Sequence, residues 1–363
     1  MLTDTLIRWF SRPTPARGAG NFWDMPVALH TYIGMVRDEN QDRVAAMRVN
    51  ATSSTGKPFL VIAIADGMGG LRDGGQCATL ALSAFFNTVI QLRHSAPKDR
   101  MLMAANAANL SVHEFSGGRG GSTLSAILVS IDDDPIGINI GDSRIYATVP
   151  ENQETTVIRL TVDDSLKEAV GGDGTELLQF VGMGEGLIPH ICQIPNDATR
   201  ILITSDGIHF VRHESLCDVL LHTRDRSELA DRLITLATWS GAPDNASLAI
   251  SNLPELIQAL ATDRVTAVEI WDAFSALHIL WRNPENGKPA TSSNDRHQRD
   301  LLDEHGVQPK IKPPRKKPTG RKKGASNTEG EKEASEPKQS PQLTLEVNPE
   351  PISPEENKNE FAS

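Results

Sequence analysis

The sequence predicts a layered α+β domain followed by a long polar tail, on three observations. Short apolar runs rich in Val and Ile, such as residues 59–65, have the length and composition of buried strands. Two longer segments, residues 73–92 and 98–114, have the apolar coverage and the helix-forming residues of helices that cover a sheet. Residues 306–363 are rich in Pro, Lys, Glu, Ser and Asn, with almost no large apolar side chains. Strands clustered with covering helices indicate packed layers.

Length and composition narrow the class of protein. The chain has 363 residues, enough for one large domain or two. Its hydrophobic fraction is 39%, and the deficit lies in the C-terminal part, so the rest can hold an ordinary core. The net charge of −11 argues against general nucleic-acid binding by the whole protein. The cysteines Cys77, Cys192 and Cys217 are widely spaced, which excludes a zinc site made of them and predicts reduced thiols.

Shifts in composition divide the chain into four expected parts. Residues 1–26 have a short apolar lead followed by prolines and glycines, and we expect a flexible N-terminal arm. Residues 27–253 form the predicted compact domain, which contains a further helix candidate near its end. Residues 254–285 are apolar and contain two tryptophans, which predicts an additional helical segment packed on the core, with a partner-binding helix as the alternative. Residues 286–363 are predicted to be largely disordered.

The tail contains a basic block, and the chain shows no targeting signal. Residues 310–323 carry eight Lys or Arg and precede an acidic stretch. Such a block suits contact with nucleic acid, a membrane surface or an acidic partner, but we favour a solubilising tail.

No apolar run approaches the ~20 residues of a membrane span. The N-terminus lacks a basic region followed by a long apolar core, so it is not a signal peptide. We therefore expect a cytoplasmic monomer without a membrane span.

Aspartates recur beside the predicted strands. The strand-like runs and their aspartates are residues 59–65 with Asp66, 136–140 with Asp142, 201–204 with Asp206, and 246–250 with Asp244. A strand that ends in Asp-Gly is, taken alone, more often a simple turn. A buried carboxylate needs a metal, a cation or hydrogen-bond donors, because burial without a partner costs several kcal/mol. Hard divalent cations such as Mg²⁺ and Mn²⁺ take oxygen ligands. The repeated placement therefore predicts a metal site lined by carboxylates.

Seven short motifs resemble, in order, those of bacterial-type PP2C (PPM family) metal-dependent protein serine/threonine phosphatases. The motifs are Arg-Asp-Glu-Asn-Gln-Asp at 37–42, Asp-Gly-Met-Gly-Gly at 66–70, Gly-Gly-Ser-Thr at 120–123, Gly-Asp-Ser-Arg at 141–144, Leu-Thr-Val-Asp at 160–163, Ser-Asp-Gly at 205–207 and Asp-Asn at 244–245. No single motif is specific, but the seven occur in the family's order, and the resemblance covers roughly residues 27–252. The resemblance implies a central antiparallel β-sandwich flanked by α-helices.

The resemblance also implies an activity, the hydrolysis of phosphoserine and phosphothreonine in proteins. In this family two Mn²⁺ or Mg²⁺ ions activate a water molecule and stabilise charge on the phosphoryl group. By position, Asp66 resembles the residue that bridges both metals, and the backbone carbonyl of Gly67 resembles a second ligand. The other implied residues are Asp206 and Asp244 as further ligands of one metal, Asp42 as a carboxylate that holds metal-bound water, and Asp142, with Asp206, at a weaker third metal.

Arg37 stands in the family's position for the arginine that binds the phosphate. Its planar fork suits bidentate binding of phosphoryl oxygens, and a surface salt bridge is the alternative. The implied partners are a phosphorylated protein substrate and a cognate serine/threonine kinase. Neighbouring motif residues have expected structural roles: Arg144 pairs with a carboxylate, Asn245 braces its turn, and residues 120–123 allow close strand packing.

Two departures from the family pattern bear on catalysis. Met68 stands where many members have a histidine that acts as general acid, although bacterial-type members share the Met. The proton for the leaving group must then come from water or another residue. His190, His209 and His213 are available by composition alone, but we favour ordinary surface or hydrogen-bonded structural roles for each of them. Asp164 replaces the histidine of the Leu-Thr-x-Asp-His-Ser pattern, and the flap after Ser165 is short. These departures leave open an alternative function, that of a catalytically weak regulator or phosphoprotein-binding module.

Overall fold

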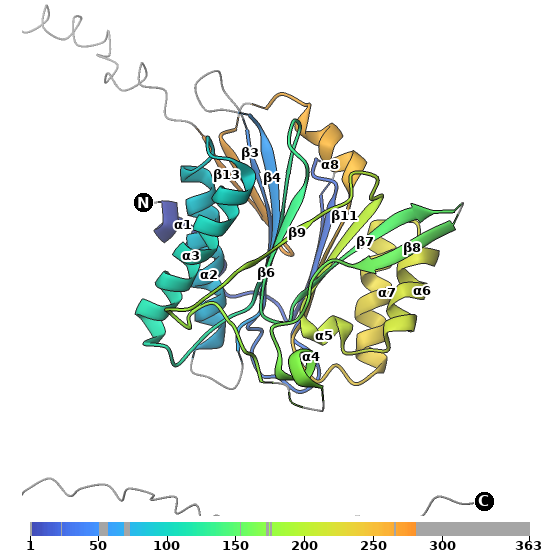
Figure 1. The fold of residues 1–363 in the computed structure, drawn as a ribbon, viewed down its shortest axis with the longest axis horizontal. Coiled ribbons are helices and arrows are strands. Elements are labelled where there is room, and N and C mark those ends of the chain that lie inside the picture. The colour runs from blue at the N-terminus through green and yellow to red at the C-terminus, as the bar shows by residue number, and fades with distance from the viewer. Residues whose placement is uncertain are drawn as a thin grey trace, which may run out of the picture. The chain divides into compact units, whose positions relative to one another are not determined.

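The computed structural model describes residues 2–22, 24–50, 57–68, 73–152, 154–171, 174, 176–264 and 266–280. The chain divides into two units, residues 1–289 and 290–363, and the second unit lies outside the described residues. In the first unit, two antiparallel sheets of six and seven strands stack face to face and carry helices on their outer faces (Figure 1). The predicted α+β fold with a helix-flanked sandwich is therefore confirmed.

The six-stranded sheet contains both the first and the eleventh strand of the chain as neighbours of β2. Its order is β1 (Arg17–Asn21), β2 (Val27–Tyr32), β11 (Ala246–Asn252), β10 (Arg200–Thr204), β7 (Arg144–Glu151) and β8 (Glu154–Arg159). Every neighbouring pair is antiparallel. The strands predicted around residues 201–204 and 246–250 are thus adjacent in the sheet.

The seven-stranded sheet has the strand before Asp66 near its centre. Its order is β13 (Ala276–Ile279), β12 (Val268–Asp272), β3 (Arg43–Val49), β4 (Phe59–Ala65), β5 (Leu124–Ser130), β6 (Ile136–Ile140) and β9 (His190–Gln193). All residues of β4 are buried because side chains alternate between its two covered faces. Leu60, Ile62 and Ile64 pack between the sheets, whereas Phe59, Val61 and Ala63 pack under helices.

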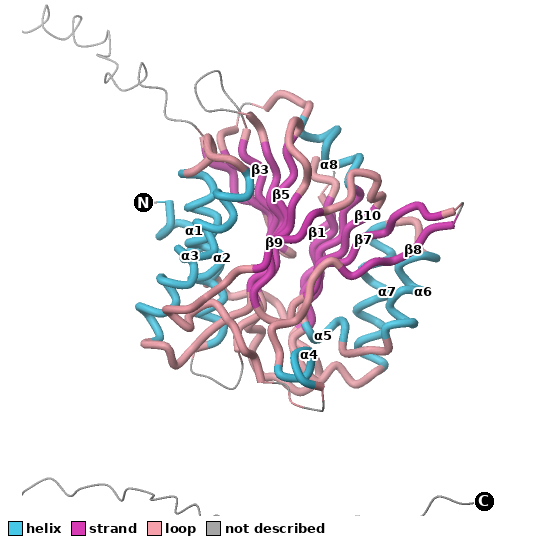
Figure 2. The backbone as a smooth tube through the Cα atoms, in the orientation of Figure 1, coloured by secondary structure: helices cyan, strands magenta, loops and turns pink. Residues whose placement is uncertain are grey.

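The helices form two separate layers, as Figure 2 shows. The helices α1 (Leu2–Phe10), α2 (Gly74–Gln91) and α3 (Pro97–Ser116) cover the seven-stranded sheet, and α6 (His213–His222) and α7 (Arg226–Trp239) cover the other sheet. Three short helices complete the set: α4 (Leu166–Val170), α5 (Asp206–His209) and α8 (Leu253–Leu260). The helices expected at residues 73–92 and 98–114 match α2 and α3 closely, since both bury wide apolar faces.

The N-terminal residues are not the flexible arm that we expected for residues 1–26. Leu6 and Phe10 of α1 are buried in the cluster that contains α2, and β1 pairs along its length with β2. The short apolar lead is therefore one face of an amphipathic helix, and tertiary packing orders it although its length alone would leave it marginal.

The expectation of an additional helical segment at residues 254–285 is only partly right. Helix α8 occupies its start, but β12 and β13 follow and extend the seven-stranded sheet through pairing of β12 with β3. Trp271 on β12 is 1% exposed, which agrees with packing on the core and not with partner binding. The apolar pattern of this segment suggested a helix, but its residues form strands because they pair with the edge of the seven-stranded sheet. The compact domain thus runs from α1 to β13, beyond the predicted limits of 27 and 253.

The remaining expectations for the C-terminal part are not tested. The expected disordered tail at residues 286–363 and its basic block at 310–323 lie outside the described residues. Among the residues that are described, no helix combines the length and apolar character needed to cross a membrane.

The packing of α1 can be tested by truncating Leu6. Leu6 is 0% exposed, so Leu6→Ala is expected to lower the free energy of unfolding by about 2–4 kcal/mol. Arg8→Ala changes the exposed face of the same helix and should shift it by less than about 0.5 kcal/mol. Urea denaturation of both variants measures the difference. Equal effects of the two substitutions would show that α1 is not packed on the domain.

Candidate functional site

The predicted site residues gather in a pocket of ≈ 690 Å³ at one end of the sheets. Those that line it are Arg37, Asp66, Gly67, Asp142, Asp206 and Asp244. Strand register explains the gathering. Arg43 of β3 pairs with Ala65 of β4, so Asp42 and Asp66 leave the seven-stranded sheet side by side. Arg144 of β7 pairs with Thr204 of β10, which brings Asp142 and Asp206 to the same end of the six-stranded sheet.

The turn that carries Asp66 is held by the Gly-Gly-Ser-Thr motif. The Asp66 backbone N–H donates to Thr123 Oγ1 at 3.1 Å, and the Thr123 N–H donates to the Asp66 carbonyl at 2.8 Å. Met68 N–H donates to the Gly121 carbonyl at 3.1 Å. A Cβ added to Gly121 would lie 2.8 Å from the Met68 sulfur, so the motif does permit close packing. The motif also fixes the orientation of the Asp66 turn, which its expected role in packing did not include.

Gly67 is a glycine because α2 begins against it. A Cβ added to Gly67 would lie 2.3 Å from the carbonyl oxygen of Gly74, the first residue of α2. That separation is far below any normal contact, so a side chain at this position would push α2 away from the turn. The close approach leaves the backbone of Gly67 on the pocket wall, as a carbonyl ligand requires.

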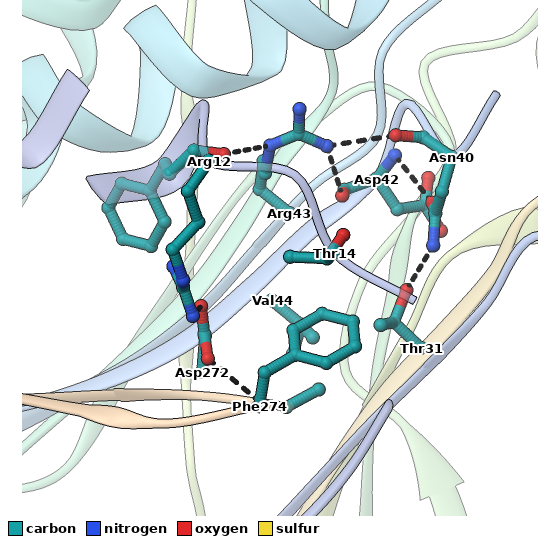
Figure 3. Close-up of a pocket in the computed structure, with 11 residues that line it drawn as sticks. Arg12, Thr14, Thr31, Asn40, Asp42, Arg43, Val44, Asp272 and Phe274 are labelled. Carbon is teal, nitrogen blue, oxygen red and sulfur yellow. Dashed lines mark hydrogen bonds and ion pairs between the residues drawn. The ribbon is translucent and has the colours of Figure 1, made fainter. Parts of the chain in front are cut away.

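Asp42 lies behind the pocket, among the buried residues. Its side chain borders a second, small cavity of ≈ 30 Å³, shown in Figure 3 with Asn40 and Arg43 beside it. Asp42 Oδ2 accepts a hydrogen bond from the Ser205 hydroxyl at 2.9 Å, and Asp42 Oδ1 is buried without a partner. The guanidinium of Arg43 donates to backbone carbonyls, including that of Asp42 itself at 2.8 Å, and so does not neutralise the carboxylate. One oxygen of Asp42 therefore remains available to a ligand.

Burial and mutual repulsion raise the pKa values of the clustered aspartates. Burial is the largest cause for Asp66, followed by repulsion from Asp42 and Asp206, and its pKa lies well above the usual value. The same causes, with burial first, raise the pKa of Asp206 to about 8. Burial raises the pKa of Asp42 and that of Asp142 to about 6. The cluster holds more negative charge than its surroundings stabilise, which favours binding of cations.

The donor set fits hard divalent cations. Carboxylate oxygens surround the pocket, and the buried Oδ1 atoms of Asp42 and Asp206 have no hydrogen-bond partner. In the described part of the chain, however, no three His, Cys, Asp or Glu side chains stand in a ready coordination cluster. Arg37 occupies both oxygens of Asp244, with Nε donating to Oδ1 at 2.8 Å and Nη2 to Oδ2 at 2.6 Å. A metal at Asp244 must therefore compete with Arg37.

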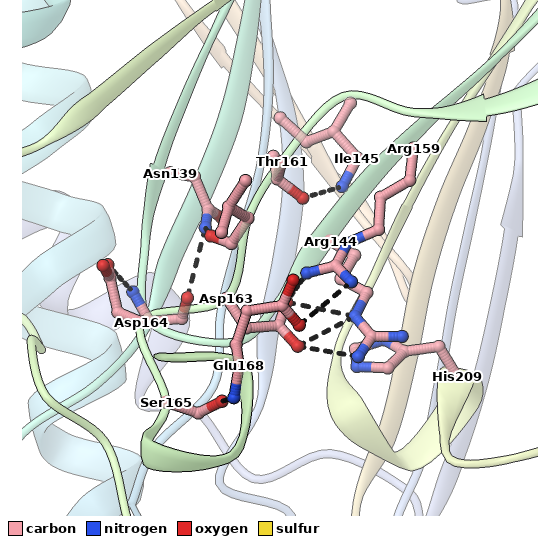
Figure 4. Close-up of polar contacts among 12 residues, drawn as sticks. Asn139, Arg144, Ile145, Arg159, Thr161, Asp163, Asp164, Ser165, Glu168 and His209 are labelled. Atoms are coloured by element: carbon pink, nitrogen blue, oxygen red, sulfur yellow. Dashed lines mark hydrogen bonds and ion pairs between the residues drawn. The ribbon is translucent and has the colours of Figure 1, made fainter. Parts of the chain in front are cut away.

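Two further motif residues have the structural roles that we expected. Asn245 accepts from the Gln41 N–H at 2.8 Å and donates to the carbonyls of Ile33 and Glu39, so it braces the loop before Asp42. Arg144 forms an ion pair with Asp163 at 2.7 Å, and Arg159 reaches the same carboxylate at 2.6 Å (Figure 4).

Asp164, which replaces the family's histidine, ties three segments to the Asp142 turn. Its Oδ2 accepts from the Gly141 N–H at 2.9 Å, and its own N–H donates to the Gly141 carbonyl at 3.0 Å. Its Oδ1 contacts Gln179 Nε2 at 3.0 Å and His190 Nε2 at 2.8 Å. Figure 4 shows Asp164 on the same loop as Asp163 and Ser165. The substitution therefore gives the chain a carboxylate that fixes the backbone beside Asp142.

Sequence reasoning missed one wall of the pocket. Lys167 of the short flap, together with His209, Phe210 and Val211 after Asp206, lines the pocket. The sequence signal that could have predicted this wall is the apolar and aromatic run directly after Ser-Asp-Gly. The Ser-Asp-Gly motif lies where β10 meets α5. Of the three histidines considered as proton donors, His209 is the one that lines this pocket, while His190 contacts Asp164.

His209 is held in its neutral form. Its Nδ1 shares a hydrogen bond of 2.8 Å with Thr204 Oγ1. Burial, followed by the charges of Arg144 and Arg159, keeps the pKa of His209 well below its usual value. A neutral imidazole is a far weaker acid than an imidazolium, so His209 does not supply the general acid that is missing at Met68.

Known proteins of similar sequence and fold are bacterial phosphatases. The protein phosphatase PhpP of Streptococcus pneumoniae is 25% identical over 249 residues, which cover 64% of this chain and 98% of PhpP. The crystal structure of the PPM Ser-Thr phosphatase MsPP from Mycobacterium smegmatis, in complex with cacodylate, is 25% identical with a TM-score of 0.50 and covers 62% of this chain and 97% of MsPP. The serine/threonine phosphatase Stp1 from Staphylococcus aureus shares the fold, with a TM-score of 0.53 at 18% identity over 66% of this chain and 99% of Stp1.

No model of a known protein family matches the chain. The resemblance to bacterial PP2C-type (PPM) phosphatases is nevertheless confirmed, in sequence by PhpP and in fold by both structures.

The carboxylate cluster predicts a dependence of stability on pH. The native pKa values of Asp42, Asp142 and Asp206 are raised to about 6, 6 and 8. The native state therefore binds more protons than the unfolded state, and stability in EDTA should fall as the pH rises from about 4 to about 8. Melting temperatures measured across this range test it. Asp206→Asn should flatten the slope, and a metal-free protein that gains stability toward pH 8 would contradict the prediction.

The role of Asp164 is tested by comparing two substitutions. Asp164→Ala removes the acceptor of the Gly141 N–H, so Mn²⁺ binding near Asp142 is expected to weaken by about 10–100-fold. Asp164→Asn keeps an oxygen that can accept this bond and should restore most of the affinity. Calorimetric titration with Mn²⁺ measures both, and His190→Phe is the control that removes only an outer contact. Equal Mn²⁺ affinity of the Ala variant and the unmodified chain would refute the positioning role.

Proposed function

We propose that this chain is a metal-dependent protein phosphatase that hydrolyses phosphoserine and phosphothreonine in proteins. The observation that carries the proposal is the gathering of buried, mutually repelling aspartates with Arg37 in one pocket of a PP2C-type fold. One relative of similar sequence is named a protein phosphatase and another, from Listeria welshimeri, a serine/threonine phosphatase, which supports an enzyme of this class.

The residues proposed to hold two Mn²⁺ or Mg²⁺ ions are those at the strand ends. Asp66 is proposed to bridge both ions, with the Gly67 carbonyl as a second ligand. The other proposed ligands are carboxylates: Asp206 and Asp244 at one ion, Asp42 toward metal-bound water, and Asp142, with Asp206, at a weaker third ion. Bound divalent ions supply an activated water molecule and charge stabilisation on the phosphoryl oxygens.

The chain's own side chains prepare this site in two ways. Thr123 fixes the Asp66 turn through two hydrogen bonds, so the carboxylate keeps its orientation. Arg37 is proposed to bind the phosphoryl group through its planar fork. The side chain is 39% exposed and already lines the pocket, so exchange of the Asp244 oxygens for phosphoryl oxygens keeps a bidentate pattern. The salt bridge seen in the structure and the phosphate role are therefore compatible.

The proton for the leaving oxygen is proposed to come from solvent. Met68 lines the pocket but has no proton to donate, and His209 is held neutral. The pocket borders the exposed flap residue Lys167, so water can reach the departing group. Ordinary general-acid catalysis contributes about 10²–10⁴-fold, so this enzyme should be slower than members that have the histidine.

The proposed partners are a phosphorylated protein and a cognate serine/threonine kinase. The short flap leaves a broad pocket, which suits an extended protein segment better than a small enclosed substrate. A catalytically weak phosphoprotein-binding module remains the second candidate, motivated by Met68 and the short flap. The complete aspartate set favours the enzyme. Buried carboxylates destabilise the fold, and a module that only binds phosphoproteins does not require this set of metal ligands.

Metal-dependent turnover is the direct test. The full chain is expected to hydrolyse phosphoserine and phosphothreonine peptides with Mn²⁺, and Asp66→Ala or Asp206→Ala should reduce turnover by about 10³-fold or more, since each is a proposed ligand. Release of phosphate is measured with and without EDTA. Arg232→Ala, which changes a solvent-exposed ion pair on α7, is a control expected to keep full activity.

Two outcomes separate the candidates. Turnover that persists in EDTA would exclude the metal mechanism. Tight binding of phosphopeptide without turnover at saturating Mn²⁺ would favour the binding module.

A further inference from the structure

A second polar pocket lies at the opposite end of the seven-stranded sheet. It measures ≈ 290 Å³ and is lined by Phe59, the first residue of β4, and by Ser130, the last residue of β5. Asp66 follows the other end of β4, and a strand rises about 3.3 Å per residue, so the two pockets are roughly 20 Å apart. Basic side chains dominate the lining: Lys57, Arg93, His94 and Arg100.

Arg100 is a buried cation without an ion pair in the described part of the chain. It is 6% exposed, although buried charges are normally paired. Its Nη2 donates to the carbonyls of Arg93 at 2.9 Å and Ser95 at 2.7 Å, and its guanidinium carbon lies 4.5 Å from the centre of the Phe59 ring. These contacts fix the side chain without an ion pair. Burial lowers the pKa of Arg100, and the charge of Asp133 offsets this only in part.

The remaining nitrogens of Arg100 indicate where a partner would bind. Nε is buried and has no hydrogen-bond partner. Nη1 also makes no hydrogen bond with any described residue and is not among the buried atoms, and Arg100 lines the pocket. A ligand in the pocket therefore meets a guanidinium edge that backbone carbonyls hold in place.

The amino end of α3 borders the same pocket. Ala96, the N-cap residue, has no side chain that can accept a hydrogen bond, and Pro97 follows at the first helical position. Both residues line the pocket. Pro97 has no N–H and the Arg100 N–H donates to the Ala96 carbonyl at 3.0 Å, so the first-turn N–H groups left without a helical acceptor are those of Lys98 and Asp99. Together with the partial positive charge of the helix end, they attract anions.

Acidic groups nearby do not cancel this charge. Asp133 lines the pocket and accepts from the Ser130 hydroxyl at 2.8 Å, but it forms no ion pair with Arg100. Asp132 pairs with Lys57 at 2.5 Å. Asp99 lies in the first turn of α3, is exposed and does not line the pocket. Asp133 and Asp132 therefore form no ion pair with Arg100, and its buried guanidinium keeps a positive charge at the pocket.

We propose that this pocket is a second, non-catalytic binding site for a phosphate-type oxyanion, held between Arg100 and the N-terminus of α3. The proposal goes beyond the phosphatase activity and does not depend on it. Inorganic phosphate and a phosphorylated side chain share this chemistry, and the volume of ≈ 290 Å³ accommodates either. The protein thus has a cation-attracting end and an anion-attracting end on one sheet.

The test is a calorimetric titration of the full chain with inorganic phosphate in EDTA. Without divalent ions the acidic pocket repels phosphate, so binding reports the basic pocket. A Kd of about 1 mM or tighter is expected. Arg100→Met should weaken binding at least tenfold. Arg119→Met is the matched control, because it removes an exposed arginine beyond the other end of α3 and should leave binding unchanged.

A second variant keeps the test valid if Arg100→Met fails to fold. Ala96→Asp places a carboxylate at the N-cap, where it caps the helix and repels an anion. Its melting temperature should be unchanged or higher while phosphate binding weakens at least tenfold. Both variants should retain Mn²⁺-dependent phosphatase activity, which separates this site from the catalytic one.

The outcomes are distinct. No binding by the unmodified chain, or binding that survives Ala96→Asp within twofold, would overturn the proposal. A parallel titration with a phosphoserine peptide and its unphosphorylated form identifies the source of the oxyanion. Tighter binding of the phosphopeptide than of phosphate would assign the site to a phosphorylated protein segment, and equal or weaker binding would assign it to free phosphate.

Discussion

The repulsion among buried carboxylates at the ends of β4, β6 and β10 is the constraint on which the rest of the structure depends. Burial is the main cause of the raised pKa values of four carboxylates, those of Asp42, Asp66, Asp142 and Asp206. Such a cluster lowers the stability of the domain unless cations offset it. The fold tolerates it because the surrounding sheets, with continuous buried strands on both sides, supply a large apolar core.

Hydrogen bonds around the cluster act on orientation and leave its charge in place. Thr123 holds the Asp66 turn, Asn245 braces the loop before Asp42, and Asp164 fixes the backbone beside Asp142. Arg37 is the exception, because its guanidinium neutralises Asp244 directly. This division suits a site that leaves its carboxylate oxygens available to metal ions while holding them in fixed directions.

The seven-stranded sheet has opposite electrostatic character at its two ends. Carboxylates crowd the end where β4 stops, and the basic pocket with Arg100 lies where β4 starts. Each end contains buried charge that the surrounding protein groups neutralise only in part, and the sign of this charge is opposite at the two ends. A cation at one end and an oxyanion at the other would each relieve an uncompensated charge, and neither site requires the other to be filled.

The sequence alone determined the local elements and the chemistry of the site. The apolar run at 59–65 and the helical segments at 73–92 and 98–114 correspond closely to β4, α2 and α3, because their patterns are long and their packing is local. The strand-end aspartates were likewise visible, since an Asp after an apolar run is a local feature.

Only the tertiary structure decided what depends on pairing between distant segments. It turned the expected arm into α1 and β1, and part of the expected helical segment into β12 and β13, because sheet edges and apolar surfaces elsewhere in the chain captured them. It also paired Arg37 with Asp244 across 207 positions and buried Arg100 without an ion pair among the described residues. Charge compensation is a property of three-dimensional neighbours, so residue type and spacing predict which groups are charged but not which of them remain unpaired.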